Sequence, residues 1–298
     1  MPRQVLPGST YLVTRRCTQR QFFLKPSPLI NSVIAFGLAY AAKKTGVILH
    51  AACAMSNHLH MVVTDPEARL PEFMHIVHLY IAKCLNASYG RWENLWASEP
   101  PSAVRLEGDE DILDKIAYTL ANPTEAELVA DGESWPGFRT SPDHVVGYRA
   151  VIQRPGVFFR PNSSVPEALE LQTSRPAIFD HQDDVQFAEL VRRAVETREA
   201  AARARVAAEG RSFAGEAAVA AQQPTDSPTT FEPRRQLSPR IAAKDKWRRI
   251  EALRRIRSFF EAYREAYQRF REHVRDVVFP AGTYAMRLRH GVLVEGAT

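Results

Sequence analysis

Two strand-like runs, 47–55 and 58–64, constrain the fold most strongly, because only the turn pair Ser56-Asn57 separates them. Strands joined by so short a turn pair antiparallel. The segments around them alternate between strand-like and helix-like patterns. We expect further strands at 9–16 and 103–106, and helices at 31–44, 70–89 and 109–121. The order β-α-β-β-α-β-α predicts an α+β fold with a ferredoxin-like antiparallel sheet and its helices on one face.

Residues that terminate helices mark the ends of the three predicted helices. Gly46 and Gly90 follow the first two, and glycine is the residue that most often ends a helix. Pro123 is expected to stop the third, because proline lacks the backbone N–H that a helix needs.

The composition changes along the chain and predicts four regions. Residues 1–138 form the first domain, and 139–209 are irregular strands followed by a helix packed beside it. Residues 210–238 mix Gly, Ser, Thr and Pro and resemble a flexible connection. Residues 239–298 are expected to be a basic, mostly helical extension, with a strand or hairpin at 279–294.

Positive charge is concentrated in the last quarter of the chain. Residues 231–298 hold 16 Lys and Arg against 8 Asp and Glu, while the other 230 residues hold 23 basic and 26 acidic side chains. A basic segment suits the phosphate backbone of a nucleic acid, because binding releases condensed counterions. Basic segments also bind membranes or simply remain solvated, so charge alone leaves the partner open.

Several classes of protein are disfavoured by the composition. No run of eighteen apolar residues predicts a transmembrane helix, and the first residues lack the apolar core of a secretory signal. The three cysteines, Cys17, Cys53 and Cys84, form no paired pattern, which predicts reduced thiols. We therefore expect a cytoplasmic protein with no membrane partner.

The pair His58-Leu59-His60 is the first candidate for chemistry. Alternate residues of a strand point to the same face, so the two imidazoles lie side by side and Leu59 points away. Paired imidazoles are a natural divalent-metal site. Taken alone, however, such a pair is more often two satisfied or exposed strand histidines.

A second candidate lies on the helix predicted at 109–121. Tyr118 and Asn122 are four residues apart and therefore share a helix face, immediately before Pro123. A tyrosine can be a covalent nucleophile, and the asparagine carbonyl can bind a hard cation. The plainer interpretation of this pair is packing plus a helix cap.

Together the two patterns resemble a known family. The segment AMSNHLHMVVTD, followed later by YTLANPTEAELV, is similar to the HUH single-tyrosine transposases, and most of all to REP-associated tyrosine transposases and their longer bacterial relatives. CLNASYGRWENLW and Trp135-Pro136 match further elements of that family. The resemblance is specific over 9–138. One departure is the segment ASEPPSAV after Trp96, where relatives carry a basic stretch, so target preference is in doubt.

The resemblance implies a fold, a site and a reaction. His58, His60 and Asn122 would bind Mg²⁺ or Mn²⁺, and Tyr118 would attack single-stranded or hairpin DNA to leave a 5′-phosphotyrosine. An ordinary tyrosine, with a pKa of about 10, is only ~0.1 % ionised at neutral pH, so the cation is the expected source of activation. The resemblance leaves open whether the protein acts as a monomer or a homodimer.

Two groups of basic residues are candidates for DNA contacts. Arg15, Arg16 and Arg20 lie on or just after the first strand, where they could equally be solvated edge charges. The second group is in the C-terminal extension and contains Lys244, Lys246, Arg248 and Arg249. Beside it, the residues Trp247, Ile250, Leu253, Ile256 and Phe260 form one apolar stripe, which favours a core face over base stacking.

Alternatives to this interpretation remain. The chain could be a domesticated, non-catalytic DNA-binding protein of the same fold, although the intact residues argue against it. A zinc hydrolase would require more ligands; His50 and Cys53 flank the pair but differ in strand parity. Tyr80 and Tyr89 are rival nucleophiles without an Asn-Pro context. His75 and His78, three residues apart on a helix, are a metal pair only if that helix is not simply packed.

Overall fold

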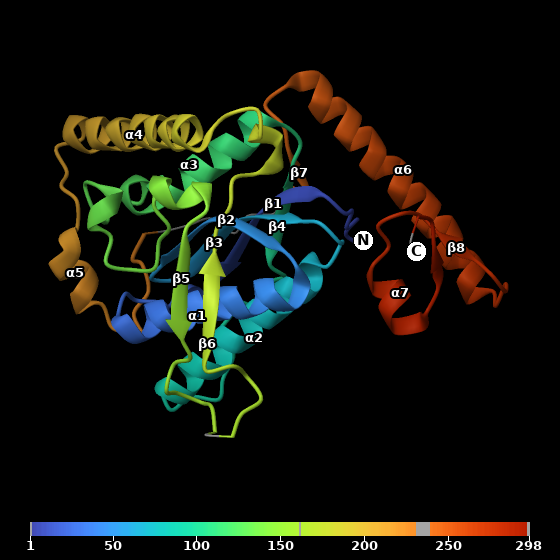
Figure 1. Ribbon diagram of the computed structural model, residues 1–298, viewed down its shortest axis with the longest axis horizontal. Helices are drawn as coiled ribbons and strands as arrows, with labels where there is room; N and C mark the ends of the chain where they lie inside the picture. The colour runs from blue at the N-terminus through green and yellow to red at the C-terminus, as the bar shows by residue number, and fades with distance from the viewer. Residues whose placement is uncertain (1, 161, 231–238, 297–298) are drawn as a thin grey trace.

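The computed structural model describes residues 2–160, 162–230 and 239–296. Its centre is a five-stranded sheet with the strand order β2-β3-β1-β4-β7 (Figure 1). The strands are β1 (Ser9–Arg16), β2 (Ile48–Met55), β3 (His58–Asp65), β4 (Ser102–Leu106) and β7 (Ile241–Ala242). The neighbours pair antiparallel except β4 and β7, which run parallel. The predicted α+β class is confirmed, and the sheet is mixed because the C-terminal segment adds its edge strand.

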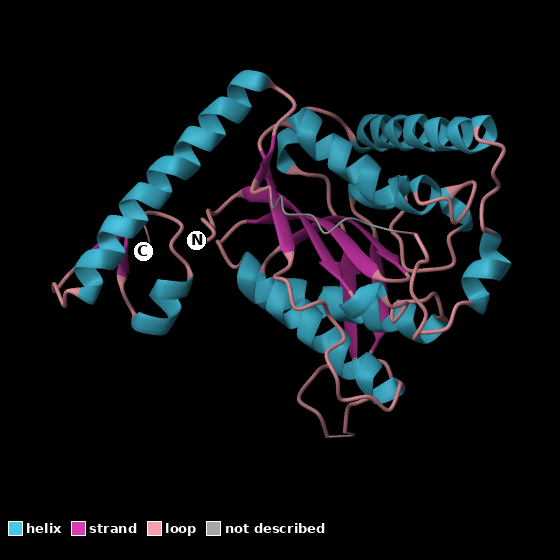
Figure 2. Ribbon diagram, turned by 180° about the vertical axis from the view of Figure 1, so that it is seen from behind, coloured by secondary structure: helices cyan, strands magenta, loops and turns pink. Residues whose placement is uncertain are grey.

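Helices cover both faces of this sheet, so the prediction of helices on one face is wrong (Figure 2). On one face, α1 (Pro28–Thr45) and α2 (Leu70–Ser88) pack on Val13 and Met61. On the other, α3 (Asp109–Glu125) packs on Leu12 and Val62, and α4 (Asp184–Ala208) packs along α3 in the same apolar cluster. The reason is that β1 and β3 carry apolar side chains on both faces, and both need a cover.

Helix α3 positions the candidate nucleophile. It begins after Gly108, and three acidic side chains in its first turn suit the positive end of the helix dipole. It continues through Pro123 to Glu125, so the expectation that Pro123 ends it is wrong. Near a helix end, the backbone bond that proline removes is one of few that remain, and the disruption is small.

The segment after 138 packs against both helical layers. The hairpin of β5 (Arg149–Gln153) and β6 (Ala168–Gln172) places Leu169 and Leu171 in the core beside α1. Helix α4 lies along α3. Further on, α5 (Gly215–Ala221) buries Val219 in the cluster that holds Cys53 and Met55. The predicted connection at 210–238 thus contains a packed helix, and its residues 231–238 lie outside the described part. Short 3-10 helices occupy Thr18–Arg20, Gly132–Ser134, Pro142–Val146 and Ala177–Phe179.

Residues 239–296 form an arm at one side of the sheet, which we call the C-terminal arm (Figure 1). Its long helix α6 (Lys246–Arg271) is followed by β8 (Val278–Phe279), α7 (Ala285–His290) and β9 (Leu293–Val294). Helix α7 lies between β8 and β9 in the sequence, and the two strands pair in parallel. The expectation of a single strand or a hairpin at 279–294 is therefore wrong.

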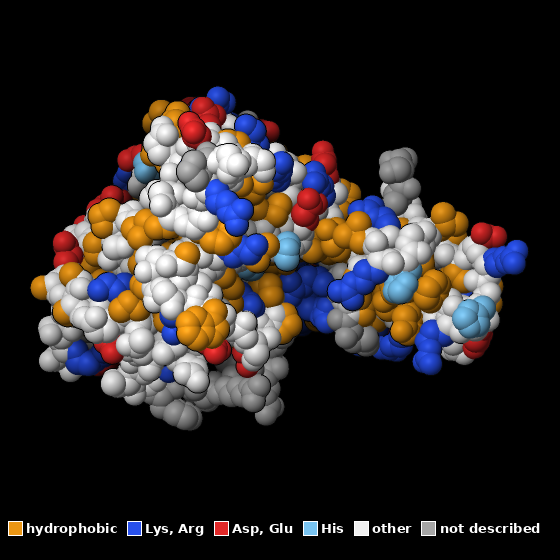
Figure 3. Space-filling model, turned by 90° about the horizontal axis from the view of Figure 1, so that it is seen from below, with side chains coloured by type: hydrophobic (Ala, Val, Ile, Leu, Met, Phe, Trp, Pro, Cys, Tyr) orange, Lys and Arg blue, Asp and Glu red, His pale blue; other side chains and the backbone are white. Residues whose placement is uncertain are grey.

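The chain's N-terminal segment links the C-terminal arm to the sheet. The Val5 N–H donates to the carbonyl oxygen of Gly282 at 3.0 Å, and Gln4 bridges to Thr283. Lys and Arg side chains gather where the arm meets the rest of the molecule (Figure 3). Across the described ranges, no helix is long and apolar enough to cross a membrane.

Candidate active site

The two histidines of β3 lie on the sheet face that α3 covers. Their ring centroids are 4.6 Å apart, and the rings meet edge to face at 87°. Leu59, between them, is buried in the cluster on the opposite face, as strand alternation predicts. The hairpin turn before β3 therefore brings two imidazoles together at the start of a central strand.

The side chain of Asn57 determines which nitrogen of His58 carries the proton. Its amide nitrogen donates to the carbonyl oxygen of Arg20 at 3.2 Å, which fixes the amide orientation. Its oxygen Oδ1 lies 2.6 Å from Nδ1 of His58 and can only accept, so Nδ1 holds the hydrogen. When the ring is neutral, its lone pair is then on Nε2, the arrangement usual for a metal-binding histidine.

His60 is buried and neutral. Burial, together with the charges of His58 and Arg16, holds the pKa of His60 well below its ordinary value of 6.5. Its Nδ1 lies 2.9 Å from Oγ1 of Thr14 on the neighbouring strand. Its Nε2 is buried without a hydrogen-bond partner among the residues that the structure describes. An unsatisfied buried nitrogen is costly in a folded protein, so a group that bonded this nitrogen would stabilise the site.

Tyr118 of α3 lies against these rings. The centroid of its half-buried ring is 5.3 Å from that of His60, with the rings at 81°. Asn122 is one helical turn further and is buried, with 6 % of its surface exposed. The strand histidines and the tyrosine of the helix, far apart in sequence, thus meet in the fold.

Two cations lie beside the Tyr118 ring, and neither was predicted from the sequence. The Lys115 ammonium lies 5.5 Å from the centre of the Tyr118 ring, and the Arg198 guanidinium of α4 lies 5.7 Å from it. Arg198 also bonds Asp114 and Glu125, each at 2.6 Å. Burial opposes ionisation of Asp114, but hydrogen bonds led by Lys115 outweigh it and hold the pKa of Asp114 below its ordinary value. Arg198 lies on α4, far from Tyr118 in the sequence, so no local sequence pattern predicts this contact.

The residues present fit a hard divalent cation. His58 and His60 offer neutral imidazoles, and Asn122 offers an amide oxygen, a set that suits Mg²⁺ or Mn²⁺ better than a thiolate-seeking metal. Within the described part of the chain, no group of three or more His, Cys, Asp or Glu side chains is placed to hold a metal ion. A third protein ligand, if one is needed, would be the amide oxygen of Asn122, and water or substrate would complete the shell.

The zinc alternative built on His50 and Cys53 is not favoured by the side chains. A β-bulge between Leu49 and Ala51 shifts the register, so the parity argument against this pair does not hold. His50 instead uses both ring nitrogens, for the Ser174 carbonyl and the Thr64 hydroxyl. Burial raises the pKa of the Cys53 thiol to about 12, which disfavours the thiolate that zinc requires.

The rival nucleophiles are core residues. The Tyr80 ring stacks between Phe36 and Phe159, at centroid distances of 5.5 and 5.4 Å. The Tyr89 hydroxyl donates to the carbonyl oxygen of Phe23 at 2.9 Å, and burial raises its pKa to about 12.

The helix-two histidines do not form a metal pair. His75 is exposed, whereas His78 is buried beside Trp96, with ring centroids 5.4 Å apart. Burial lowers the pKa of His78 to about 3.

The three arginines predicted to contact DNA near β1 do not form one patch. Arg15 points to the α1 and α2 face, where it donates to the carbonyl oxygens of Ala97 and Glu99. Arg16 lies opposite His58 on the neighbouring strand and on the histidine face. Arg20 donates to the carbonyl oxygen of Thr230 at 2.7 Å. Of the three, Arg16 is the one placed beside the candidate site.

The predicted basic group of the C-terminal arm is exposed, as DNA contacts would need. Lys244 pairs with Asp114 at 3.1 Å, and Arg248 pairs with Asp109 at 3.4 Å. Lys246 lies over the Trp247 ring, at 5.7 Å from its centre, and Arg249 is exposed on α6.

The predicted apolar core stripe of α6 is wrong in part. Trp247 is 72 % exposed and Leu253 is 52 % exposed. The face that packs runs instead through Ala252, Phe259 and Ala266. The buried face differs from the predicted one because α6 docks through two alanines and one phenylalanine, not through the larger apolar side chains of the predicted stripe.

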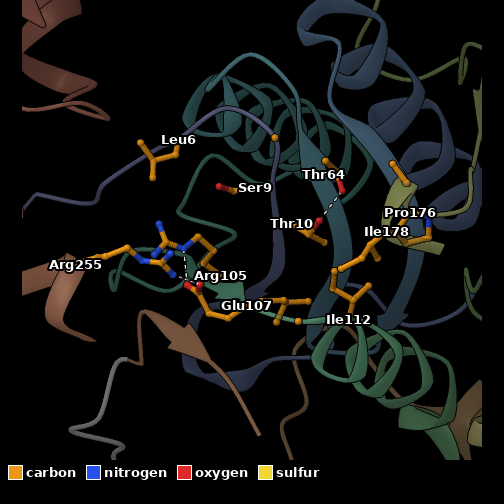
Figure 4. Close-up of a pocket in the computed structure, with 14 residues that line it drawn as sticks. Leu6, Ser9, Thr10, Thr64, Arg105, Glu107, Ile112, Pro176, Ile178 and Arg255 are labelled. Atoms are coloured by element: carbon orange, nitrogen blue, oxygen red, sulfur yellow. Dashed lines mark hydrogen bonds and ion pairs between the residues drawn. The ribbon is translucent and has the colours of Figure 1, made fainter. Parts of the chain in front are cut away.

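A pocket of about 340 Å³ lies on the histidine face but near the other end of the strands (Figure 4). It is lined by Thr10 and Thr64, whose hydroxyls are 2.7 Å apart, and by Arg105, Glu107 and Arg255. Glu107 pairs with both arginines, at 2.7 and 2.5 Å. The predicted catalytic residues do not line it, so it is separate from the candidate site.

No protein-family model matches the chain, and no curated protein does. Among solved structures, one similar chain is a REP-associated tyrosine transposase bound to a REP hairpin, with 14 % identity, a TM-score of 0.39, and coverage of 46 % of this chain and 79 % of that one. Another is a candidate transposase from Deinococcus radiodurans, with 16 % identity, a TM-score of 0.28, and coverage of 35 % and 83 %. Because both TM-scores are below 0.5, the functional argument rests on the side-chain geometry.

Proposed function

We propose that the protein is a metal-dependent DNA transposase that cleaves and rejoins single-stranded or hairpin DNA through Tyr118. The observation that carries this proposal is the meeting of three rings, His58, His60 and Tyr118, with a buried and unsatisfied Nε2 on His60. His78 also buries an unpartnered Nε2, but it lies beside Trp96, whereas the His60 ring has a second imidazole and a tyrosine beside it.

The reaction is a transesterification at phosphorus. The Tyr118 hydroxyl oxygen attacks the scissile phosphate, the bond from phosphorus to the 3′ oxygen breaks, and the proton lost by tyrosine ends on the departing 3′ hydroxyl. The product is a 5′-phosphotyrosine, which a second 3′ hydroxyl can attack to restore Tyr118 and join a new strand. The bond energy is conserved, so neither ATP nor an organic cofactor is needed.

The protein's own residues prepare this step. His58 and His60, with Asn122, would hold the cation, which would polarise the phosphate and stabilise the charge that develops on it. Asn57 and Thr14 orient the two imidazoles from behind. Lys115 and Arg198 lie over the Tyr118 ring and both pair with Asp114, so they would hold the ring in place for an incoming phosphate.

A second candidate function is a domesticated DNA-binding protein that has kept the fold without the chemistry. The exposed basic residues of the C-terminal arm would support it. It gives no account, however, of the fixed tautomer of His58 or of the neutral, unpaired nitrogen of His60.

Formation of a covalent protein–DNA adduct tests the proposal. The protein is incubated with end-labelled hairpin DNA and Mn²⁺, and the label retained by denatured protein is measured. Tyr118→Phe should abolish the adduct, whereas the control Tyr40→Phe, which alters a tyrosine of α1, should form it normally. An adduct of undiminished yield in Tyr118→Phe would show that another residue is the nucleophile. No adduct in the unaltered protein, with DNA binding intact, would favour the second candidate.

A further inference from the structure

Helix α6 carries a surface that its packing does not explain. One face is buried through Ala252, Phe259 and Ala266, each seven residues from the next. This face accounts for how the helix docks on the rest of the molecule. At 26 residues the helix is about 39 Å long, and most of its remaining circumference is exposed.

Beside the buried face runs a stripe in which cationic and apolar side chains alternate, here called the α6 stripe. Its cations are Arg249, Arg257, Arg264 and Arg271, which are 8, 7 and 7 positions apart. Between them lie Leu253, Phe260 and Tyr267. Steps of three and four residues throughout keep all seven on one side of the helix. The three glutamates of α6 fall outside it.

The arginines of the α6 stripe differ from the other arginines of the helix. Arg248 and Arg255 pair with Asp109 and Glu107, which lie on the sheet-bearing part of the molecule. Among the residues described, Arg249, Arg257, Arg264 and Arg271 have no acidic partner within ion-pair distance. Four unpaired cations on one surface with no intervening acid are complementary to a polyanion.

Two of the three apolar members of the α6 stripe, Leu253 and Tyr267, are exposed enough to contact a base. Leu253 is 52 % exposed and Tyr267 is 42 % exposed. Tyr263 covers one face of the Tyr267 ring, with centroids 6.0 Å apart and planes 9° from parallel. A stacked, half-covered ring presents its other face as a rigid platform. Phe260 is half-buried, and the Arg240 guanidinium carbon lies 4.9 Å from the centre of its ring, so this face of the ring is already covered.

We propose that the α6 stripe binds an unpaired strand of DNA outside the candidate active site. Successive arginines are about 11 Å apart along the helix, which spans about three nucleotides of a strand in helical form. The arginines would contact phosphates, and bases would stack on the side chains between them. That the nucleic acid is DNA rests on the proposed function; the stripe itself argues only for a strand with phosphates and bases.

The first test measures how affinity depends on salt. Binding of a 20-nucleotide dT strand is followed from 50 to 300 mM NaCl in the Tyr118→Phe background, which removes the chemistry. Arg257→Gln/Arg264→Gln should weaken binding about tenfold and reduce the slope of log K against log salt by about 1.4, since each single-strand phosphate contact contributes about 0.7. The matched control Arg248→Gln/Arg255→Gln removes the same charge from the same helix and should change the slope by less than half as much. Equal effects of the two variants would overturn the proposal.

The second test separates bases from phosphates. Tyr267→Ala should weaken binding to the dT strand at least about fivefold, the loss expected for one stacked base, and should leave binding to an abasic strand of equal length unchanged. Equal losses on both strands would overturn the stacking assignment.

A third measurement separates DNA from a membrane surface. Vesicles containing one-third phosphatidylserine should bind the unaltered protein and the double arginine variant alike. If the variant loses vesicle binding but keeps its affinity for dT, the α6 stripe is a lipid-binding surface and the proposal is wrong. Because binding is read without cleavage, failure of the Tyr118 chemistry and failure of the stripe give different results.

Discussion

Around β3 and α3 the polar side chains are buried, neutral or paired, whereas along the outer side of α6 they are exposed and charged. His60 is held neutral under α3, and Asp114 and Arg198 neutralise each other beside Tyr118. On α6, four arginines face solvent with no acidic partner among the described residues. The difference matches the two tasks that we propose for these regions. Chemistry requires groups whose protonation and orientation are fixed before the substrate arrives, whereas capture of a polyanion requires charge that solvent can reach.

Removing a buried imidazole should have the largest effect. If the proposed function holds, His60→Ala should lower Mn²⁺-dependent cleavage at least about 100-fold, because it would remove a ligand to a cation that stabilises the transition state by several kcal/mol. DNA affinity should change little, since the exposed charges remain. The exposed His75→Ala is the matched control and should cleave normally. A cleavage rate within threefold of the unaltered protein would remove His60 from the site.

Loss of the residue that orients His58 should have a smaller effect. Asn57→Ala should weaken Mn²⁺ affinity about 10- to 100-fold, the usual cost of removing a partner that fixes a metal-binding histidine. Asn57→Asp keeps an oxygen that accepts from Nδ1 and should recover most of the affinity. Titration of Mn²⁺ against cleavage measures both. If both variants lost the same Mn²⁺ affinity, Asn57 would stabilise only the turn and would not orient His58.

The buried neutral histidines should make the sheet region acid-sensitive. Burial lowers the pKa of His50 to about 4. Between pH 7 and 5, His50 therefore becomes protonated in the unfolded chain but stays neutral in the folded protein. Stability therefore rises with pH in this window, and His50 alone should cost about 2 kcal/mol on going from pH 7 to 5. Urea unfolding at both pH values should show this loss reduced by that amount in His50→Gln. An unchanged pH dependence would mean that His50 is not neutral in the folded protein.

The exposed side of α6 should tolerate change best. Trp247→Ala should alter the free energy of unfolding by less than about 0.5 kcal/mol, because its side chain is largely in solvent. Phe259→Ala, on the buried face of the same helix, should cost about 3 kcal/mol. Equal losses of stability in thermal unfolding would show that Trp247 is a core residue, as the sequence pattern predicted.

The comparison also explains which features were predictable from the sequence. Alternation placed His58 and His60 on one face, and helical spacing placed Tyr118 and Asn122 together, because both depend on local backbone geometry. The β-bulge at His50 broke the same rule, since an extra residue in one strand is a feature of pairing, not of composition. The opposite directions of Arg15 and Arg16 followed from alternation and could have been predicted.

What sequence reasoning missed depended on distant packing. Arg198 reaches Tyr118 from a helix that follows 80 residues later, and nothing near either residue signals the contact. The docking face of α6 was misplaced by a few residues because two apolar stripes compete along it, and only the surface it packs on decides between them. The packing of α3 and α4 over the second face of the sheet was also not predicted, because it depends on contacts between segments far apart in the sequence.

The central claim is that Tyr118 becomes joined to DNA, and the most direct measurement is to identify the residue that carries the nucleotide. The adduct formed with hairpin DNA and Mn²⁺ is digested with nuclease and protease, and the modified peptide is sequenced by mass spectrometry. We expect a nucleotide phosphate on Tyr118, absent when the cation is chelated. A nucleotide on any other residue, or an adduct that forms equally well with chelator, would contradict it.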